Sequence, residues 1–167
     1  MGLRNIRNVA HQGKSLEKLL TDHSRWLAKR TGRKDDSAIG RASLVEADLA
    51  GVDLRGADLS DADLSRANLE NADLSFAKVE SAFLPRASLR QANLHATDMR
   101  LAFLPHADVT RARLSQTNLS YGDVRWARFD EATLWDVDLT AAMIDDAQFY
   151  AATFECVRLC GCDLRIC

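Results

Sequence analysis

The chain has 167 residues and a formal net charge of −2, and 47% of its residues are hydrophobic, which fits one domain with a short additional segment. No apolar run reaches the roughly 18 residues that a membrane-spanning helix needs, and the N-terminus lacks the apolar stretch of a secretory signal. The composition therefore argues against a membrane protein or a membrane partner and predicts a cytoplasmic protein.

Charge is distributed unevenly along the chain. Residues 1–41 carry ten Lys and Arg against four acidic residues, a net charge of +6. The remainder is banded, with −6 over residues 42–74, +4 over residues 75–128 and −6 over residues 129–167. A basic leader therefore precedes a segment whose middle is positive and whose two ends are acidic.

The leader is predicted to contain one helix. Residues 1–14 show no period, and we expect them to fray. An apolar stripe of helical spacing then begins, with Ser15 as the N-cap and Gly32 just past the helix end, followed by a polar link. The pattern predicts a helix over residues 15–31, and its apolar stripe consists of Leu16, Leu19, Leu20, His23, Trp26 and Leu27.

A period of five residues extends from residue 42 to residue 166 without a slip, which makes 25 units. The central position of every unit holds a large apolar residue, and the residue two places earlier is small, mostly Ala. The other three positions are mainly polar. Because neither 3.6 nor 2.0 divides five, the pattern predicts neither an amphipathic helix nor an alternating strand.

A second, longer period lies over the first. The unit AFLPR at residues 82–86 returns as AFLPH at residues 102–106, which is twenty residues or four units later. A fixed short period over most of a chain indicates a repeat architecture. We therefore expect coils of four units that bury the large and the small residue and stack at the β spacing of about 4.8 Å.

Residues 42–166 resemble the pentapeptide repeat family, whose consensus is A(D/N)LXX. The units ADLSD at residues 57–61, ADLSR at residues 62–66 and ANLEN at residues 67–71 match it closely. The resemblance implies an all-β solenoid, a right-handed quadrilateral β-helix. With four units in each coil, the 25 units make about six coils.

The chain is thus expected to divide into the leader, residues 1–41, and a β-helix, residues 42–167. An open solenoid end exposes unpaired strand edges, so the leader helix is expected to cap the first coil with its apolar stripe. The segment LEKLLTDHSRWLAKR also resembles the short helix that precedes the repeats in many bacterial members of the family. The alternative is a basic amphipathic helix that binds nucleic acid, a membrane or a partner helix. On the stripe, His23 is expected to be a packed residue rather than a ligand.

One face of the predicted coil departs from the consensus. Phe83 and Phe103 hold the outward position before the central residue, where the consensus has Asp or Asn, and they should lie one above the other. Contiguous exposed apolar surface with Tyr, Trp and Arg is typical of interfaces, whereas the alternative is that the two rings form a stabilising ladder between strands. The predicted partner-binding residues are Phe83, Pro85, Arg86, Leu101, Phe103, Pro105, Tyr121, Arg125 and Trp126.

Twelve of the first 24 units carry Asp or Asn at the position before the central residue. We expect these short side chains to accept hydrogen bonds from local backbone amides and to favour the corner turns, not to form acid and base pairs. The sequence has no phosphate-binding Gly-rich loop, no nucleophile elbow and no two His with metal-like spacing. The expectation is a protein that is not an enzyme and has no cofactor and no metal.

All four cysteines lie in the last twelve residues, and their spacing matches no zinc motif. The five-residue register points Cys162 and Cys167 inward and Cys156 and Cys160 outward. No helix, proline or charged block closes the last coil, so we expect end-to-end homodimers through the C-terminal coils. The resemblance adds support, because dimers of the quinolone-resistance branch of the family form at that end.

Two functions follow from this reading. The first is a protein–protein interaction module, a rigid rod that presents the aromatic and basic residues to an unidentified protein partner. The alternative is the DNA mimicry known in the family, in which an acidic rod occupies the DNA-binding site of gyrase. The first is favoured because the midsection is positive, the leader is basic and the register never breaks to insert a gyrase-engaging loop. Direct nucleic-acid binding is not expected, because the chain has no recognition helix or nucleic-acid fold motif.

Overall fold

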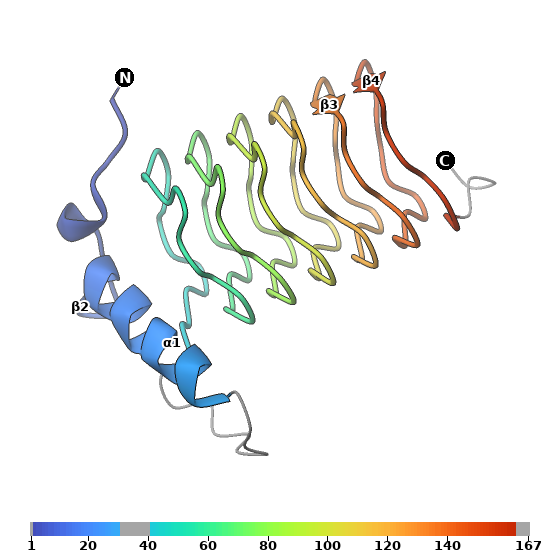
Figure 1. Ribbon diagram of the computed structural model, residues 1–167. Coiled ribbons are helices and arrows are strands. Elements are labelled where there is room, and N and C mark those ends of the chain that lie inside the picture. The colour runs from blue at the N-terminus through green and yellow to red at the C-terminus, as the bar shows by residue number, and fades with distance from the viewer. Residues whose placement is uncertain (1, 31–40, 163–167) are drawn as a thin grey trace.

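A computed structural model describes residues 2–30 and 41–162, and it shows a tower of stacked coils with the leader beside the first coil (Figure 1). None of the helices within these ranges has the length and apolarity to cross a bilayer. In chain order the elements are the 3-10 helix η1 (Ile6–Asn8), strands β1 (Ala10–His11) and β2 (Lys14–Ser15), helix α1 (Leu16–Arg30), and strands β3 (Thr133–Trp135) and β4 (Thr153–Glu155).

Neighbouring coils pair in parallel through residues that are twenty positions apart. Phe83, for example, pairs with Phe103, and β3 pairs with β4 so that Leu134 lies opposite Phe154. Most of these pairings involve one residue on each side of a coil, which explains why few residues count as strand. The twenty-residue register confirms the prediction that four units make one coil.

The core is built from the two inward positions of each unit. Every central residue from Leu44 to Ile144 is buried, and most of the small residues two places earlier are buried as well. Where Thr97 replaces Ala at the small position, its hydroxyl donates a hydrogen bond of 2.9 Å to the carbonyl of Leu74. The polar group is therefore satisfied inside an apolar core.

The corners of the coil depend on a left-handed residue at the end of each unit. The fifth residue has a positive φ in every unit from Glu46 (58°) to Gly161 (78°), and most of these residues are not glycine. Each non-glycine residue in this region costs about 1 kcal/mol or more. The cost is offset by hydrogen bonding, because the Glu46 amide donates to the carbonyl of Ser65 in the next coil at 2.9 Å and its equivalents do the same along the tower.

Helix α1 lies against the first coil and begins within one residue of the predicted start. Ser15 caps it, with its hydroxyl accepting from the Lys18 amide at 3.2 Å. Leu16 and His23 are fully buried, and the Nδ1 atom of His23 accepts a hydrogen bond of 3.1 Å from the Ala42 amide. Trp26 stacks on His23 with ring centroids 5.6 Å apart. The other stripe residues, Leu19, Leu20 and Leu27, are half-buried.

The expectation that residues 1–14 fray is wrong. Arg4 pairs in parallel with Val52, donating its amide to Gly51 and accepting from the Asp53 amide at 2.6 and 2.9 Å. A tight hairpin then joins β1 to β2 through Gln12 and Gly13, whose φ values of 49° and 76° suit a two-residue turn. Backbone pairing needs no side-chain period, so the sequence pattern could not reveal this contact.

Two predicted features lie outside the described residues: the polar link that begins at Gly32, and Cys167. Of the other cysteines, Cys156 and Cys160 are exposed, as the register predicts. Cys162 is half-buried and donates its thiol to the Leu139 carbonyl at 2.9 Å. Cys156 and Cys160 are free thiols.

Leu104 and Leu101 provide a matched test of the inward register, because Leu104 is 1% exposed and Leu101 is 54% exposed. We expect Leu104→Ala to lower the free energy of unfolding by about 2–5 kcal/mol, since it opens a cavity in the core. Leu101→Ala should change it by about 0.5 kcal/mol or less. Chemical unfolding followed by circular dichroism measures both, and similar losses for the two variants would contradict the register.

His23 predicts a pH-dependent attachment of α1. Burial lowers the pKa of His23 below its ordinary value of 6.5, so the unfolded chain takes up a proton at higher pH than the folded chain does. The contribution of neutral His23 to stability is therefore complete above about pH 6.5 and is lost as the pH falls through the lowered pKa. We expect the Ala42 amide to lose hydrogen-exchange protection between pH 7.5 and pH 5.5, after correction for the intrinsic exchange rate. In His23→Asn, which keeps an acceptor and does not titrate, protection should be independent of pH over this interval; the same decline in both proteins would refute the role of His23.

Candidate functional site

The predicted partner-binding residues lie on one side of the tower and its flanking corners, which we call the aromatic face. Its centre is the pair Phe83 and Phe103, whose rings stack with centroids 4.7 Å apart and planes 5° from parallel. Phe83 is 38% exposed and Phe103 is half-buried. The predicted ladder is thus present, and it leaves apolar surface in contact with solvent. The residues of the aromatic face are Phe83, Pro85, Arg86, Leu101, Phe103, Pro105, Tyr121, Arg125 and Trp126.

The polar residues that Phe83 and Phe103 replace have a structural task. Within one unit, four backbone amides find backbone acceptors and the amide of the fourth residue does not. In residues 62–66, for example, this is the amide of Ser65, and the carboxylate of Asp63 accepts it at 3.0 Å. All twelve predicted Asp and Asn residues accept the amide two residues later in this way, namely Asp48, Asp53, Asp58, Asp63, Asn68, Asp73, Asn93, Asp98, Asp108, Asn118, Asp123 and Asp138.

This task explains why Phe83 and Phe103 are each followed two residues later by proline. Phe83 and Phe103 cannot accept a hydrogen bond, and Pro85 and Pro105 have no amide hydrogen to donate. Proline also suits the place, because the fourth residue precedes a residue of positive φ, as the first central residue of a type II turn does. The Phe and Pro substitutions are therefore one change, which removes a donor and its acceptor together.

The two corners beside the phenylalanines carry further exposed side chains. Leu101 and Tyr121, which lie at the same corner of successive coils, are 54% and 61% exposed. On the other corner, Trp126 is 42% exposed and stacks on His106 with ring centroids 5.0 Å apart. The Trp126 indole donates to Asp146 at 3.0 Å, which fixes the ring in place.

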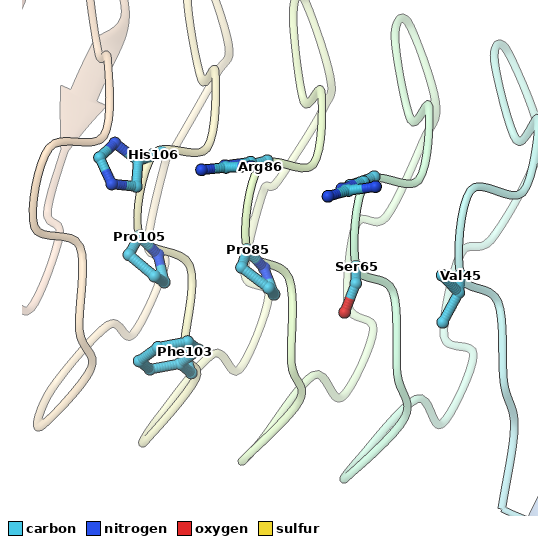
Figure 2. Close-up of a pocket in the computed structure, with 8 residues that line it drawn as sticks. Val45, Ser65, Pro85, Arg86, Phe103, Pro105 and His106 are labelled. Atoms are coloured by element: carbon cyan, nitrogen blue, oxygen red, sulfur yellow. The ribbon is translucent and has the colours of Figure 1, made fainter.

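An open groove of about 480 Å³ crosses the aromatic face. Figure 2 shows Val45, Ser65, Pro85 and Pro105 in a row along four successive coils, with Arg86 and His106 in a second row beside them. The lining residues are Val45, Ser65, Arg66, Pro85, Arg86, Phe103, Pro105 and His106. Sequence reasoning missed Val45, Ser65, Arg66 and His106 as members of this site, although the twenty-residue period aligns them with Pro85 and Arg86.

The basic band is largely neutralised by neighbouring carboxylates. This band is residues 75–128, which contain seven arginines. Five of the seven form ion pairs, including Arg125, which lies 2.6 Å from Asp123. Burial acts to raise the pKa of Asp123, but hydrogen bonds from Arg125 outweigh it, and the pKa lies below its ordinary value of 3.8. Among the arginines of residues 41–162, Arg86 and Arg113 alone have neither an ion pair nor a side-chain hydrogen bond.

The chemistry of the face is that of recognition by contact. It offers apolar rings, the half-buried Pro85 and a guanidinium that is not engaged within the described chain, whereas the predicted contact residue Pro105 is buried. Across residues 2–30 and 41–162, no three His, Cys, Asp or Glu side chains converge as metal ligands would. Another exposed aromatic residue, Phe76, lies outside this face and packs edge-on against His95 at 5.2 Å.

Comparison with known proteins identifies one family. The family model for pentapeptide repeats matches residues 41–75, 67–104 and 107–143. None of the curated proteins matches the chain.

Among solved structures, HetL from the cyanobacterium Nostoc sp. strain PCC 7120 is similar with a TM-score of 0.54 and 28% sequence identity. HetL is a pentapeptide repeat protein involved in the regulation of heterocyst differentiation. The match covers 72% of this chain and 65% of HetL, so the chain spans slightly less than two thirds of that relative.

Two further solved structures have TM-scores below 0.5. The trypsin-treated form of QnrB1, a plasmid-mediated fluoroquinolone resistance protein, has a TM-score of 0.47 and 25% identity over 73% of this chain and 59% of QnrB1. The pentapeptide repeat protein alr5209 from Nostoc PCC 7120 has a TM-score of 0.46 and 25% identity, over 83% of this chain and 93% of its own.

The coupling of Phe103 to Pro105 is testable by a double-mutant cycle. Pro105→Ser alone should destabilise the protein, because it introduces a backbone amide whose hydrogen bond the Phe103 side chain cannot accept. When Phe103→Asn is already present, the same change supplies an amide that donates a hydrogen bond to the new Asn side chain, as the His95 amide does to Asn93. We expect a favourable coupling of about 1 kcal/mol in the free energy of unfolding. Additive effects of the two substitutions would refute the explanation.

Proposed function

Because the chain belongs to the pentapeptide repeat family, we propose that it is a non-catalytic protein-binding module that presents the aromatic face to a partner protein. In this proposal the rod is a right-handed quadrilateral β-helix of about six coils, as the family resemblance implies, and it acts in the cytoplasm. It needs no cofactor, metal or direct nucleic-acid contact.

The observation that carries the proposal is the exposed apolar surface around Phe83 and Phe103. Four residues of this face, on one side of the tower and the two corners beside it, are each more than a third exposed: Phe83, Leu101, Tyr121 and Trp126. Aromatic residues and arginine are enriched at the centres of protein interfaces. The hydrogen-bonded coils hold the backbone of these residues in place, so little backbone entropy is lost when a partner binds.

DNA mimicry of gyrase is the weaker alternative. Its support is the net charge of −6 over residues 42–74 and again over residues 129–167. A mimic of duplex DNA needs a long continuous negative face, whereas the band between these segments is positive. Many of the carboxylates are also committed to backbone amides and arginines, which reduces the charge that they offer to a partner.

A homodimer through the C-terminal coils is a separate part of the proposal. Phe154 occupies a central position, yet it is 47% exposed in the last described coil. Phe149 and Leu159 beside it are half-buried. A second copy stacked on this end would bury these core positions.

The test replaces the two Phe and Pro pairs of the aromatic face with Asn and Ser, the pair found at Asn118 and Ser120. We call the protein with all four substitutions, Phe83→Asn, Pro85→Ser, Phe103→Asn and Pro105→Ser, the corner variant. Both of its changed units regain the usual donor and acceptor, so the fold should persist while the apolar surface is lost. We expect wild-type protein to retain a partner in cross-linking and affinity capture from the native lysate, and the variant to lose it at an unchanged melting temperature.

Phe76→Asn is the matched control, since Phe76 is 63% exposed away from the face and Asn71 already occupies the equivalent place one unit earlier with a φ of 57°. Retention of the partner by the corner variant, or its loss from Phe76→Asn as well, would contradict the proposal. Light scattering on each protein identifies a further contrary result: if the corner variant converts a dimer to a monomer, the aromatic face joins two copies of the chain instead.

A further inference from the structure

The groove on the aromatic face is lined by two unlike rows of side chains. One row, at the fourth position of one unit in each of four successive coils, consists of the short side chains Val45, Ser65, Pro85 and Pro105. It forms the floor of the groove beside Phe103, and Pro105 itself is buried. The other row, at the fifth position, carries Arg66, Arg86 and His106. A floor that is apolar except for Ser65 therefore lies beside this second row, the cationic wall, in which Arg66 is paired with Glu46.

The length of the groove fits a short extended peptide. Four coils at about 4.8 Å spacing span about 14 Å from Val45 to Pro105, which is the length of four or five residues in an extended strand. The next residue of the floor row is Arg125, a long side chain that is tied to Asp123 and lies 5.2 Å from the Trp126 ring. The floor of short side chains therefore ends at Pro105.

Arg86 is the unengaged cation of the cationic wall. Its neighbour on one side, Arg66, is paired with Glu46 at 3.1 Å. On the other side, His106 is stacked on Trp126. Arg86 has no side-chain partner within the described chain, so its guanidinium can form hydrogen bonds with a carboxylate from outside.

We infer that the groove binds an extended segment of a partner protein in which apolar and acidic residues alternate, with one carboxylate on Arg86. Side chains of an extended segment point alternately to opposite sides, so one set packs on Pro85, Pro105 and Phe103 while the other set meets Arg86. This inference rests on the proposed function and specifies the chemistry of its partner.

A nucleic acid is the less suitable occupant. A polyanion needs several cations along its backbone, whereas Arg66 is already paired with Glu46. A segment with one carboxylate among apolar side chains matches the groove better, because Arg86 is the one unpaired arginine among its lining residues.

The experiment compares fluorescein-labelled Leu-Glu-Leu-Glu-Leu amide with Leu-Gln-Leu-Gln-Leu amide on the full chain, by fluorescence polarisation and NMR titration. We expect wild-type protein to bind the Glu peptide more tightly and Arg86→Gln to weaken that binding about tenfold or more. Arg86→Glu should instead prefer Leu-Lys-Leu-Lys-Leu amide. NMR shifts should centre on Pro85, Arg86, Phe103 and His106.

Arg113→Gln is the matched control, because Arg113 is the other unpaired exposed arginine and lies outside the groove. Both glutamine variants should fold normally: Gln91 and Gln148 hold the equivalent positions in other units. Equal affinity of wild type and Arg86→Gln for the Glu peptide, equal affinity of wild type for the Glu and Gln peptides, or tighter binding of a labelled oligothymidylate overturns the inference.

The two proposals fail in different ways. If the corner variant loses its partner while the peptides show no preference for Glu, the protein-binding function stands and the chemistry assigned to its partner is wrong. If the corner variant keeps its partner, the proposed function fails whatever the peptides show.

Discussion

The hydrogen bond that closes each corner is the constraint on which the rest of this structure depends. A five-residue unit turns through a corner and pairs with the coils on either side, and this leaves the amide of its fourth residue without a backbone acceptor. A buried or half-buried amide without an acceptor is costly, and fourteen units avoid this cost: twelve supply a side-chain acceptor and two remove the donor. The Asp and Asn residues of the repeat do the first, and Pro85 and Pro105 do the second.

This constraint changes the meaning of the acidic residues. A row of aspartates on a rod suggests an electrostatic surface, but here each carboxylate already accepts a backbone amide, and several also bind arginine. Asp98 and Asp108 illustrate the balance: burial acts to raise their pKa values, and hydrogen bonds from Arg100 to the first and from Thr110 and Arg90 to the second lower them further than burial raises them. The residues that look most like a charged interface therefore maintain the fold.

The same constraint also determines where a binding surface can arise. A second residue that accepts this hydrogen bond has to be short and polar, so the units that use Asp or Asn contribute no apolar surface at that position. Proline at the fourth residue removes that requirement, so Phe83 and Phe103 can occupy the second position. The stack of the two rings then stabilises neighbouring coils and exposes apolar area at once, which means that the structural and the binding interpretations of this pair are compatible.

The sequence by itself determined the features that repeat. The period of five identifies the buried residues, the recurrence of AFLPR as AFLPH predicts which residues pair, and the register alone places Phe83 over Phe103. The tertiary structure decided what depends on single contacts between residues far apart. It joined Val45 and Ser65 to a groove with Pro105, it paired Arg125 with Asp123 and left Arg86 unpaired, and it placed Arg4 beside Val52. A period specifies which positions align, whereas ion pairing and strand addition depend on side-chain reach and on backbone edges that no period records.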